Sequence, residues 1–163
     1  MTIRVASPAD APVIVAMLAR LADETGDGAR FASTPDTVRA HGFGPAALFQ
    51  TMIAEQDSQT TGIALFFRHY SSTRGQPGVY VQDLWTAPDA RGQGLGARLL
   101  AAVADHARRG WGACYMALTT HGHNDAARSF YARLGFTAQA DDVPMALDGA
   151  GFAGLGTGSE AVA

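Results

Sequence analysis

Residues 79–97 decide the fold, and they read Val79-Tyr80-Val81-Gln82-Asp83-Leu84-Trp85-Thr86-Ala87-Pro88-Asp89-Ala90-Arg91-Gly92-Gln93-Gly94-Leu95-Gly96-Ala97. The stretch opens with β-branched and aromatic residues, which favour a strand. Pro88 ends this strand, because proline has no backbone N–H to donate. Three glycines then alternate over five positions, and apolar residues recur at helical spacing from Leu95 to Ala107. The stretch therefore predicts a strand, a glycine-rich turn and a helix.

The predicted turn has the features of an anion-binding site. The first N–H groups of a helix have no partner within the helix and lie at the positive end of its dipole. Glycines let the backbone approach a bulky phosphate, and the guanidinium of Arg91 can add a charge-assisted contact. The alternative is a loop that is rich in glycine for steric reasons alone. Three alternating glycines directly after an arginine favour the phosphate site.

Two other phosphate-binding motifs fit this turn less well. A P-loop ends in Gly-Lys followed by Ser or Thr, and the chain has no such ending. The run from Gly92 to Ala97 satisfies the dinucleotide fingerprint in its Gly/Ala form. That fingerprint requires an acidic residue about 20 positions later, and residues 115–120 contain none.

The turn instead resembles the pyrophosphate loop of the GCN5-related N-acetyltransferase superfamily, Arg/Gln-x-x-Gly-x-Gly/Ala. Arg91, Gly94 and Gly96 occupy its three defined positions. The later signature of the superfamily, an Asn and then Phe-Tyr before Leu-Gly-Phe, is matched between Asn124 and Phe136. Two signatures in the expected order are more specific than either alone.

Composition indicates one globular domain, which we expect over residues 1–150, followed by a loose tail over 151–163. The chain has 163 residues, of which 47% are hydrophobic, and a formal net charge of −3. This charge disfavours nucleic acid as a partner and favours a cationic substrate. We expect a cytoplasmic protein with no membrane partner, because no secretory signal or membrane span is visible. Cys114 is the only cysteine, and we expect it to be buried in the core.

The remaining pattern predicts an α/β fold with helices on both faces of a mixed, mostly antiparallel sheet of six or seven strands. The resemblance implies central strands that splay at the phosphate loop, as in the acyl-CoA N-acyltransferase fold. Helices are expected at 8–24, 34–42, 95–109 and 124–134, and strands at 2–7, 48–55, 62–70, 79–86, 113–119 and 143–147.

Within the superfamily, the chain resembles the diamine (spermidine/spermine-type) acetyltransferase branch. The resemblance rests on His41-Gly42-Phe43-Gly44 and on residues 80–84, among other segments. This branch also acts on lysine-like side chains and commonly forms homodimers. It usually has two adjacent acids where this chain has Gln82-Asp83, and an acid and a Trp where this chain has residues 119–123. These departures lie on the amine side of the site.

The resemblance implies an acetyl-CoA-dependent N-acetyltransferase that acts on a primary amine of a small molecule. The alternatives are an acetyltransferase for a protein N-terminus or lysine, and a non-catalytic acyl-CoA-binding module. No metal is expected, because His121-Gly122-His123 has no neighbouring cysteine or carboxylate cluster. A substrate contact by His121, or a solvated loop, is the better interpretation.

The resemblance also assigns roles to individual residues. Tyr131 matches the general acid of the superfamily, which protonates the leaving thiolate. Asp83 is the first candidate for binding the amine or acting as its base, and Glu55 is the second. Strand alternation places Gln82 and Asp83 on opposite faces, but a β-bulge, known from the superfamily at this place, would change that.

The cofactor and substrate contacts complete the expected site. The acidic residues at positions 23, 24 and 27 form either a solvated loop or an acidic lip that attracts the amine. The backbone of Leu84, Trp85 and Thr86 is expected to pair with the pantetheine, and the N–H groups of the loop with the pyrophosphate. The expected cofactor-binding residues are Leu84, Trp85, Thr86, Arg91, Gly92, Gln93, Gly94, Leu95, Gly96, Ala97, Asn124, Ala126, Ala127 and Tyr131, and the expected substrate-binding residues are Gln82, Asp83 and His121.

Overall fold

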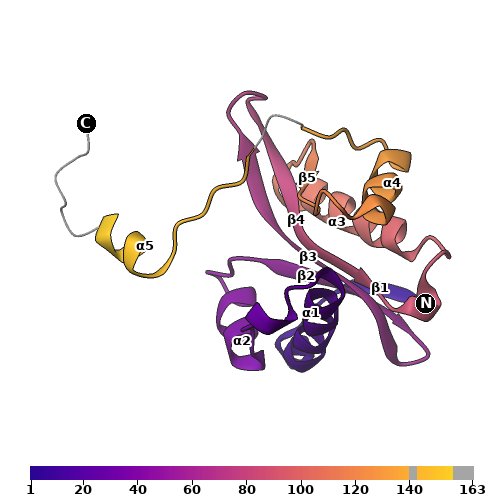
Figure 1. The fold of residues 1–163 in the computed structure, drawn as a ribbon. Helices are drawn as coiled ribbons and strands as arrows, with labels where there is room; N and C mark the ends of the chain where they lie inside the picture. Colours follow the sequence, from indigo (N-terminus) through magenta and orange to yellow (C-terminus); the bar gives the residue numbers. More distant parts are fainter. Residues whose placement is uncertain (140–142, 156–163) are drawn as a thin grey trace. The chain divides into compact units, whose positions relative to one another are not determined.

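The computed structural model describes residues 1–139 and 143–155, and the chain divides into two compact units, Met1–Asn124 and Asp125–Ala163 (Figure 1). The first unit contains β1 (Thr2–Val5), α1 (Ala11–Thr25), α2 (Pro35–Gly42), β2 (Gln50–Gln56), β3 (Gln59–Ser71), β4 (Gln76–Thr86), α3 (Leu95–Trp111) and β5 (Met116–Leu118). Short 3₁₀ turns lie at η1 (Pro8–Asp10), η2 (Gly28–Arg30) and η3 (Pro88–Ala90). The second unit contains α4 (Asp125–Arg133) and α5 (Gly149–Leu155).

The sheet of the first unit has the strand order β1-β2-β3-β4-β5. Neighbouring strands are antiparallel from β1 to β4, and β4 and β5 are parallel. The predicted mixed, mostly antiparallel sheet is therefore confirmed, with five strands in the described residues instead of six or seven.

The expected strand at 143–147 is wrong. This segment has no regular structure, and the side chains of Val143 and Met145 are 79% and 93% exposed. Its alternating apolar residues suit a strand, but Pro144 cannot donate to a ladder, and the described residues offer it no partner strand.

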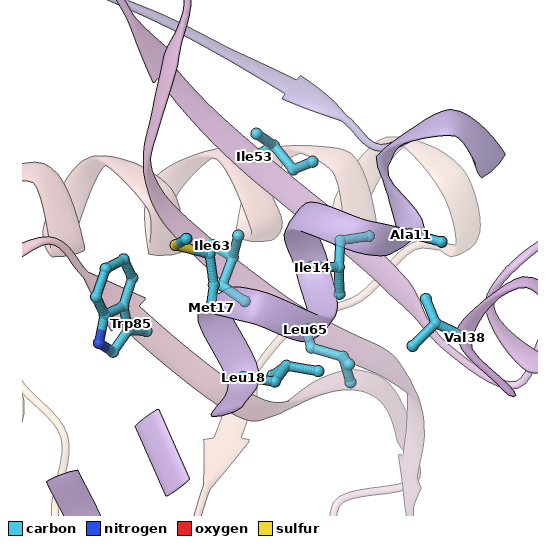
Figure 2. Close-up of a cluster of buried hydrophobic side chains, with 9 residues drawn as sticks. All are labelled: Ala11, Ile14, Met17, Leu18, Val38, Ile53, Ile63, Leu65 and Trp85. Carbon is cyan, nitrogen blue, oxygen red and sulfur yellow. The ribbon is translucent and has the colours of Figure 1, made fainter. Parts of the chain in front are cut away.

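Helices cover both faces of the sheet in the first unit: α1 and α2 lie on one face and α3 on the other (Figure 1). Figure 2 shows the core on the α1 face, where Ile14 and Met17 lie close to Ile63 and Trp85. On the opposite face, the ring of Phe66 meets His106 of α3 at 5.7 Å between centroids. In the described ranges, no helix combines the length and apolar character that crossing a membrane requires.

Two irregularities in β4 prepare the site. In the register with β3, Asp83 pairs with Leu65 and Val81 pairs with Phe66, so Gln82 is an extra residue. This is a β-bulge, and it breaks the period-two alternation of the strand. The parallel pairing with β5 ends at Val81, so the strands part before residues 82–86. The predicted splay at the phosphate loop is thus confirmed.

Cys114 differs from its prediction. It lies directly before β5 and is exposed instead of buried, and its thiol donates to the carbonyl oxygen of Gly112 at 3.2 Å. Its apolar neighbours in sequence misled the prediction, because the segment before β5 bonds to β4 through its backbone, from the N–H of Cys114 to the carbonyl oxygen of Pro77, while the Cys114 side chain is exposed.

Candidate active site

A cleft of about 340 Å³ opens between α1, α2 and the bulged part of β4. Seven of its fourteen lining side chains are apolar, and the other seven are polar or charged. Its lining residues are Leu18, Leu21, Ala22, Thr25, Asp27, Phe31, Ser33, Thr37, Val38, His41, Phe49, Leu65, Gln82 and Asp83. An apolar cavity with a few polar groups that converge in it is typical of a small-molecule site.

Asp83 supplies the carboxylate in the wall formed by β4. It is half-buried, and burial raises the pKa of this carboxyl group to about 6. Within the described residues, no side chain donates a hydrogen bond to it. A half-buried carboxylate without a partner is suited to receive a cation from a ligand.

The bulge brings Gln82 and Asp83 into the same cleft. Simple alternation would have turned one of these side chains to the α3 face. The structure therefore follows the bulged alternative considered from the sequence. Both predicted substrate residues on β4 lie together.

Asp27 lies in the cleft wall after the end of α1, and it brings His121 to the same region. The Nε2 atom of His121 lies 3.6 Å from the Oδ2 atom of Asp27. Arg30 also donates to Asp27, and this hydrogen bond is the main reason that the pKa of the Asp27 carboxyl group is lowered. Of the three acidic residues at positions 23, 24 and 27, Asp27 lines the cleft, next to the predicted substrate residue His121.

Glu55, the second candidate base, lies outside the cleft lining. It pairs with Thr2 at the β1–β2 edge, and its carboxylate accepts from Arg4 at 2.7 and 3.0 Å. Arg4 also donates twice to Asp10, at 2.8 Å each. This hydrogen bonding from Arg4 lowers the pKa of both carboxyl groups. A carboxylate held in this way serves the fold and is a weak base.

Arg4→Met should make the protein less stable at neutral pH, by a few degrees in the unfolding midpoint. The lowered pKa of Asp10 and Glu55 means that their pairing with Arg4 stabilises the fold above the ordinary carboxyl pKa near 4. That stabilisation is lost as the pH falls through the lowered folded-state values. Urea unfolding at pH 7 and at pH 3 should therefore show a difference between wild type and variant that shrinks in acid. A difference that is constant with pH would contradict an ionic role for this cluster.

The loop between β4 and α3 has the geometry expected of a phosphate site. Gly92 and Gly94 have φ angles of +74° and +76°, and a Cβ atom added to either would meet no atom within 4 Å. The first helical hydrogen bond of α3 runs from the N–H of Arg98 to the carbonyl oxygen of Gly94, at 3.1 Å. The N–H groups of residues 95–97 precede this bond and have no acceptor in the helix. These N–H groups lie at the N-terminal end of α3, which has 17 residues.

Arg91 is held by the protein itself. Its Nε atom donates to the carbonyl oxygen of Thr86 at 3.0 Å, and its Nη2 atom donates to both carboxylate oxygens of Glu24 at 2.7 and 2.9 Å. Trp85 donates from Nε1 to the same carboxylate at 3.1 Å. Sequence analysis did not find this role of Glu24, because 67 residues separate it from Arg91 and no local pattern links them.

The predicted pantetheine contacts lie on the open part of β4. Residues 84–86 pair with β3 on one edge, and on the other edge β5 has already ended. The side chain of Trp85 is only 2% exposed and belongs to the core. Any contact from Trp85 to a cofactor would therefore come from its backbone.

The second unit carries Tyr131 on α4. Its ring lies against Phe130 and Phe136, with centroid distances of 5.1 and 5.5 Å. Tyr131 is half-buried, and burial raises the pKa of its phenol. The helix α4 begins at Asp125, directly after Asn124, and Ala126 and Ala127 lie in its first turn.

Several residues of the cleft were not predicted from the sequence. Thr37, Val38 and His41 come from one face of α2, and Phe31 and Phe49 flank that helix in the chain. The spacing of the three α2 residues by one and three positions is a helical signal, but it does not tell which face meets a ligand. His41 was noticed only as part of the family resemblance.

Comparison with known proteins agrees with this architecture. The protein-family model described as "Acetyltransferase (GNAT) family" matches residues 16–136. The thialysine N-epsilon-acetyltransferase of Sus scrofa is 30% identical over 111 residues, which cover 63% of this chain and 65% of that protein. The uncharacterized N-acetyltransferase YhfO of Bacillus subtilis is 34% identical over 85 residues, which cover 52% of this chain and 56% of that protein. The chain thus spans less than two thirds of the length of these curated relatives.

A solved structure shares the fold over almost the whole chain. An integron cassette protein from the mobile metagenome of V. cholerae superposes with a TM-score of 0.76 at 19% identity, covering 97% of this chain and 99% of that one. At this identity the likeness concerns the fold alone. The family match extends from α1, through the sheet and the glycine-rich loop, to the end of the Leu-Gly-Phe signature. The chain therefore belongs to the acetyltransferase (GNAT) family.

Proposed function

We propose that the protein transfers the acetyl group of acetyl-CoA to a primary amine of a small molecule. The observation that carries this proposal is Asp83, a half-buried carboxylate to which no side chain of residues 1–139 and 143–155 donates, in a cleft beside the open edge of β4. The named relative from Sus scrofa, a thialysine N-epsilon-acetyltransferase, supports an amine at the end of a lysine-like chain. The cleft volume of about 340 Å³ is in the range of small-molecule sites.

The chain fits acetyl-CoA at two places that adjoin each other. The loop over residues 91–97 offers N–H groups and open space at the positive end of α3, which suits a pyrophosphate. The unpaired edge of β4 at Leu84, Trp85 and Thr86 offers backbone groups that can pair with the amides of pantetheine. By resemblance, we add Asn124, Ala126 and Ala127 to these contacts. Acetyl-CoA, when bound, supplies the thioester.

The cleft prepares the amine for attack. An alkylammonium ion with a pKa near 10.4 is mostly charged at neutral pH and must lose a proton before it can react. Asp83, with a pKa of about 6, is mostly ionised at pH 7, and it can bind the ammonium and accept this proton, directly or through water. Gln82 and His121, with Asp27, can orient the rest of the substrate from the cleft wall and its rim.

The transfer itself forms a carbon–nitrogen bond and breaks a carbon–sulfur bond. The amine nitrogen attacks the thioester carbonyl, and a backbone N–H near Leu84 stabilises the oxyanion, a contribution commonly worth about 3 kcal/mol. By resemblance to the superfamily, we assign protonation of the leaving thiolate to Tyr131. Its phenol is protonated at neutral pH, as a general acid requires, because its pKa is raised by burial above an ordinary value that is already near 10.

The direct test is release of free CoA thiol from acetyl-CoA in the presence of single amines. The panel contains diamines, polyamines, lysine-like amino acids and a lysine peptide. We expect amine-dependent thiol release with one of the small amines and a mass gain of one acetyl group on that amine. Release with the peptide alone would redirect the proposal to protein acetylation. Binding of acetyl-CoA without any acetyl transfer would leave only an acyl-CoA-binding module.

Asp83→Asn should raise the amine KM, lower turnover, or both, and leave acetyl-CoA affinity unchanged. The acidic limb of the kcat/KM profile near pH 6 should disappear, because this limb reports the carboxyl group. The loss should be smaller for an amine of lower pKa, which needs less help to become neutral. Steady-state kinetics between pH 5 and pH 9 measures all of this.

Asp36→Asn is the matched control for Asp83→Asn, because Asp36 lies on α2 with a side chain that is 94% exposed. The kinetics of Asp36→Asn should match those of the wild type.

The raised pKa of Asp83 also means that the ionisation of Asp83 lowers the stability of the fold as the pH rises from about 4 to about 6. Asp83→Asn should therefore be at least as stable as the wild type at pH 7. Normal kinetics of Asp83→Asn with every reactive amine would make Asp83 a structural residue.

By resemblance to the diamine acetyltransferase branch, we infer that the protein forms a homodimer. Light scattering at micromolar concentration should then give twice the chain mass of 17.0 kDa. A monomeric mass would contradict this inference.

A further inference from the structure

Three segments that are distant in the sequence meet at the carboxylate of Glu24. Oε1 accepts from Nε1 of Trp85 at 3.1 Å and from Nη2 of Arg91 at 2.9 Å, and Oε2 accepts from the same Nη2 at 2.7 Å. Glu24 lies in the last turn of α1, Trp85 lies near the end of β4, and Arg91 begins the glycine-rich loop. The carboxylate therefore joins the helix of the amine cleft to the loop of the predicted pyrophosphate site.

These contacts run outward from the buried core, from Trp85 through Glu24 to Arg91. The indole of Trp85 is fixed in the core, at 2% exposure, so its N–H is a rigid donor that fixes the carboxylate. The carboxylate then holds Arg91, whose side chain is otherwise 46% exposed. Arg91 in turn donates to the carbonyl oxygen of Thr86, which closes the turn over η3. The start of the loop is thus fixed from the core outward.

Fixing Arg91 in this way matters because ordering the glycine-rich loop loses much conformational entropy. Gly92 and Gly94 have positive φ angles, and a Cβ atom added to either would meet no atom within 4 Å. Glycine loses more conformational freedom on ordering than any other residue. A ligand that binds a loose loop must supply this ordering free energy from its own contacts, whereas a pre-ordered loop binds it more tightly.

We propose that Glu24 is a positioning residue that pre-orders the pyrophosphate loop through Arg91. The inference rests on the proposed binding of acetyl-CoA. The inference also predicts the direction in which the affinity for acetyl-CoA changes when the charge of Glu24 is removed. The negative charge of Glu24 by itself repels an anionic ligand, so removal of that charge would tighten binding if only through-space electrostatics acted. Loss of pre-ordering weakens binding instead.

The test compares acetyl-CoA affinity by calorimetry in the wild type, Glu24→Gln and Asp105→Asn. Glu24→Gln keeps the shape and an acceptor for Trp85 but loses the charge that holds Arg91. Asp105 is the matched control, because it lies on α3, its side chain is 40% exposed against 41% for Glu24, and it pairs with Arg108 and Arg109. Glu24→Gln should bind about fivefold more weakly, a loss near the upper end of what a partly exposed ion pair contributes. Asp105→Asn should bind as the wild type does.

A double-mutant cycle with Arg91→Gln identifies the route of the effect. In the Arg91→Gln background, Glu24→Gln should cause no further loss, because the residue through which it acts is gone. The fivefold difference between wild type and Glu24→Gln should also shrink as salt screens the ion pair. A residue that only stabilised the fold would lower the unfolding temperature without these two signatures.

Unchanged or tighter binding by Glu24→Gln would overturn the inference, and so would an equal loss in the Arg91→Gln background. The proposed function fails separately. If the wild type binds no acetyl-CoA, both proposals fall. If it binds acetyl-CoA and acetylates an amine while Glu24→Gln binds equally well, only the role of Glu24 is wrong.

Discussion

Gly94→Asp should reduce acetyl-CoA affinity by at least about 100-fold while the protein stays folded. A side chain at this position enters open space at the start of α3, where a Cβ atom meets no neighbour within 4 Å. There its carboxylate occupies the positive end of the helix dipole and repels the pyrophosphate that we expect at the same place. Calorimetric titration with acetyl-CoA, together with a thermal unfolding curve, measures both parts of the prediction.

Gly112→Asp and Gly94→Asn are the matched controls for Gly94→Asp. Gly112 caps the other end of α3 with a φ angle of +71° and equally open surroundings, so it tests the backbone strain and the added charge away from the loop. Asn has nearly the shape of Asp and tolerates the left-handed conformation, so it separates bulk from charge. Gly112→Asp should bind acetyl-CoA normally, and Gly94→Asn should lose less affinity than Gly94→Asp. An affinity of folded Gly94→Asp within a few-fold of the wild type would refute the phosphate-loop assignment.

Tyr131→Phe should lower turnover by roughly 10²–10⁴-fold, the usual size of a general-acid contribution. The change removes one hydroxyl group and retains the ring contacts with Phe130 and Phe136. Acetyl-CoA affinity and stability should therefore hardly change. Single-turnover kinetics with an amine whose chemical step limits the rate is the decisive measurement.

Tyr115→Phe is the control for the loss of a tyrosine hydroxyl. Tyr115 is also half-buried, and its hydroxyl group lies 2.7 Å from Nδ1 of His69, outside the cleft lining. Its turnover should equal that of the wild type. Near-normal turnover of Tyr131→Phe under the same conditions would show that another group or water protonates the thiolate.

Local pattern predicted the strand, loop and helix around residues 79–97, because each of these elements is specified by neighbouring residues. β-branched residues before Pro88, glycines at positive φ and an apolar stripe along α3 act over a few positions only. The helices expected at 8–24 and 34–42 are specified locally as well, because Ser7 lies at the N-cap of η1, which leads into α1, and Thr34 lies at the N-cap of α2. These are the parts of the fold in which local preference and tertiary packing agree.

The errors arose where a long-range partner decides the outcome. Residues 143–147 have the alternation of a strand, but a strand also needs a neighbouring strand, and sequence alternation alone does not supply one. Glu55 has a suitable side chain, but the β1–β2 register places it beside Arg4. The role of Glu24 depends on contacts across 61 and 67 residues. In each case the missing information was a pairing in space, which composition and periodicity do not contain.

The bulge at Gln82 has a consequence for how this enzyme family member can change over evolutionary time. Gln82 has no cross-strand partner in the β3–β4 register, yet its side chain lines the cleft. Its exchange therefore disturbs neither the ladder nor the core, whereas most positions of β4 are constrained by both. If the protein acetylates an amine as we propose, the strand thus carries one position at which mutations can alter that amine with little effect on folding. Diversification of substrate range in this chain would begin most easily at that single extra residue.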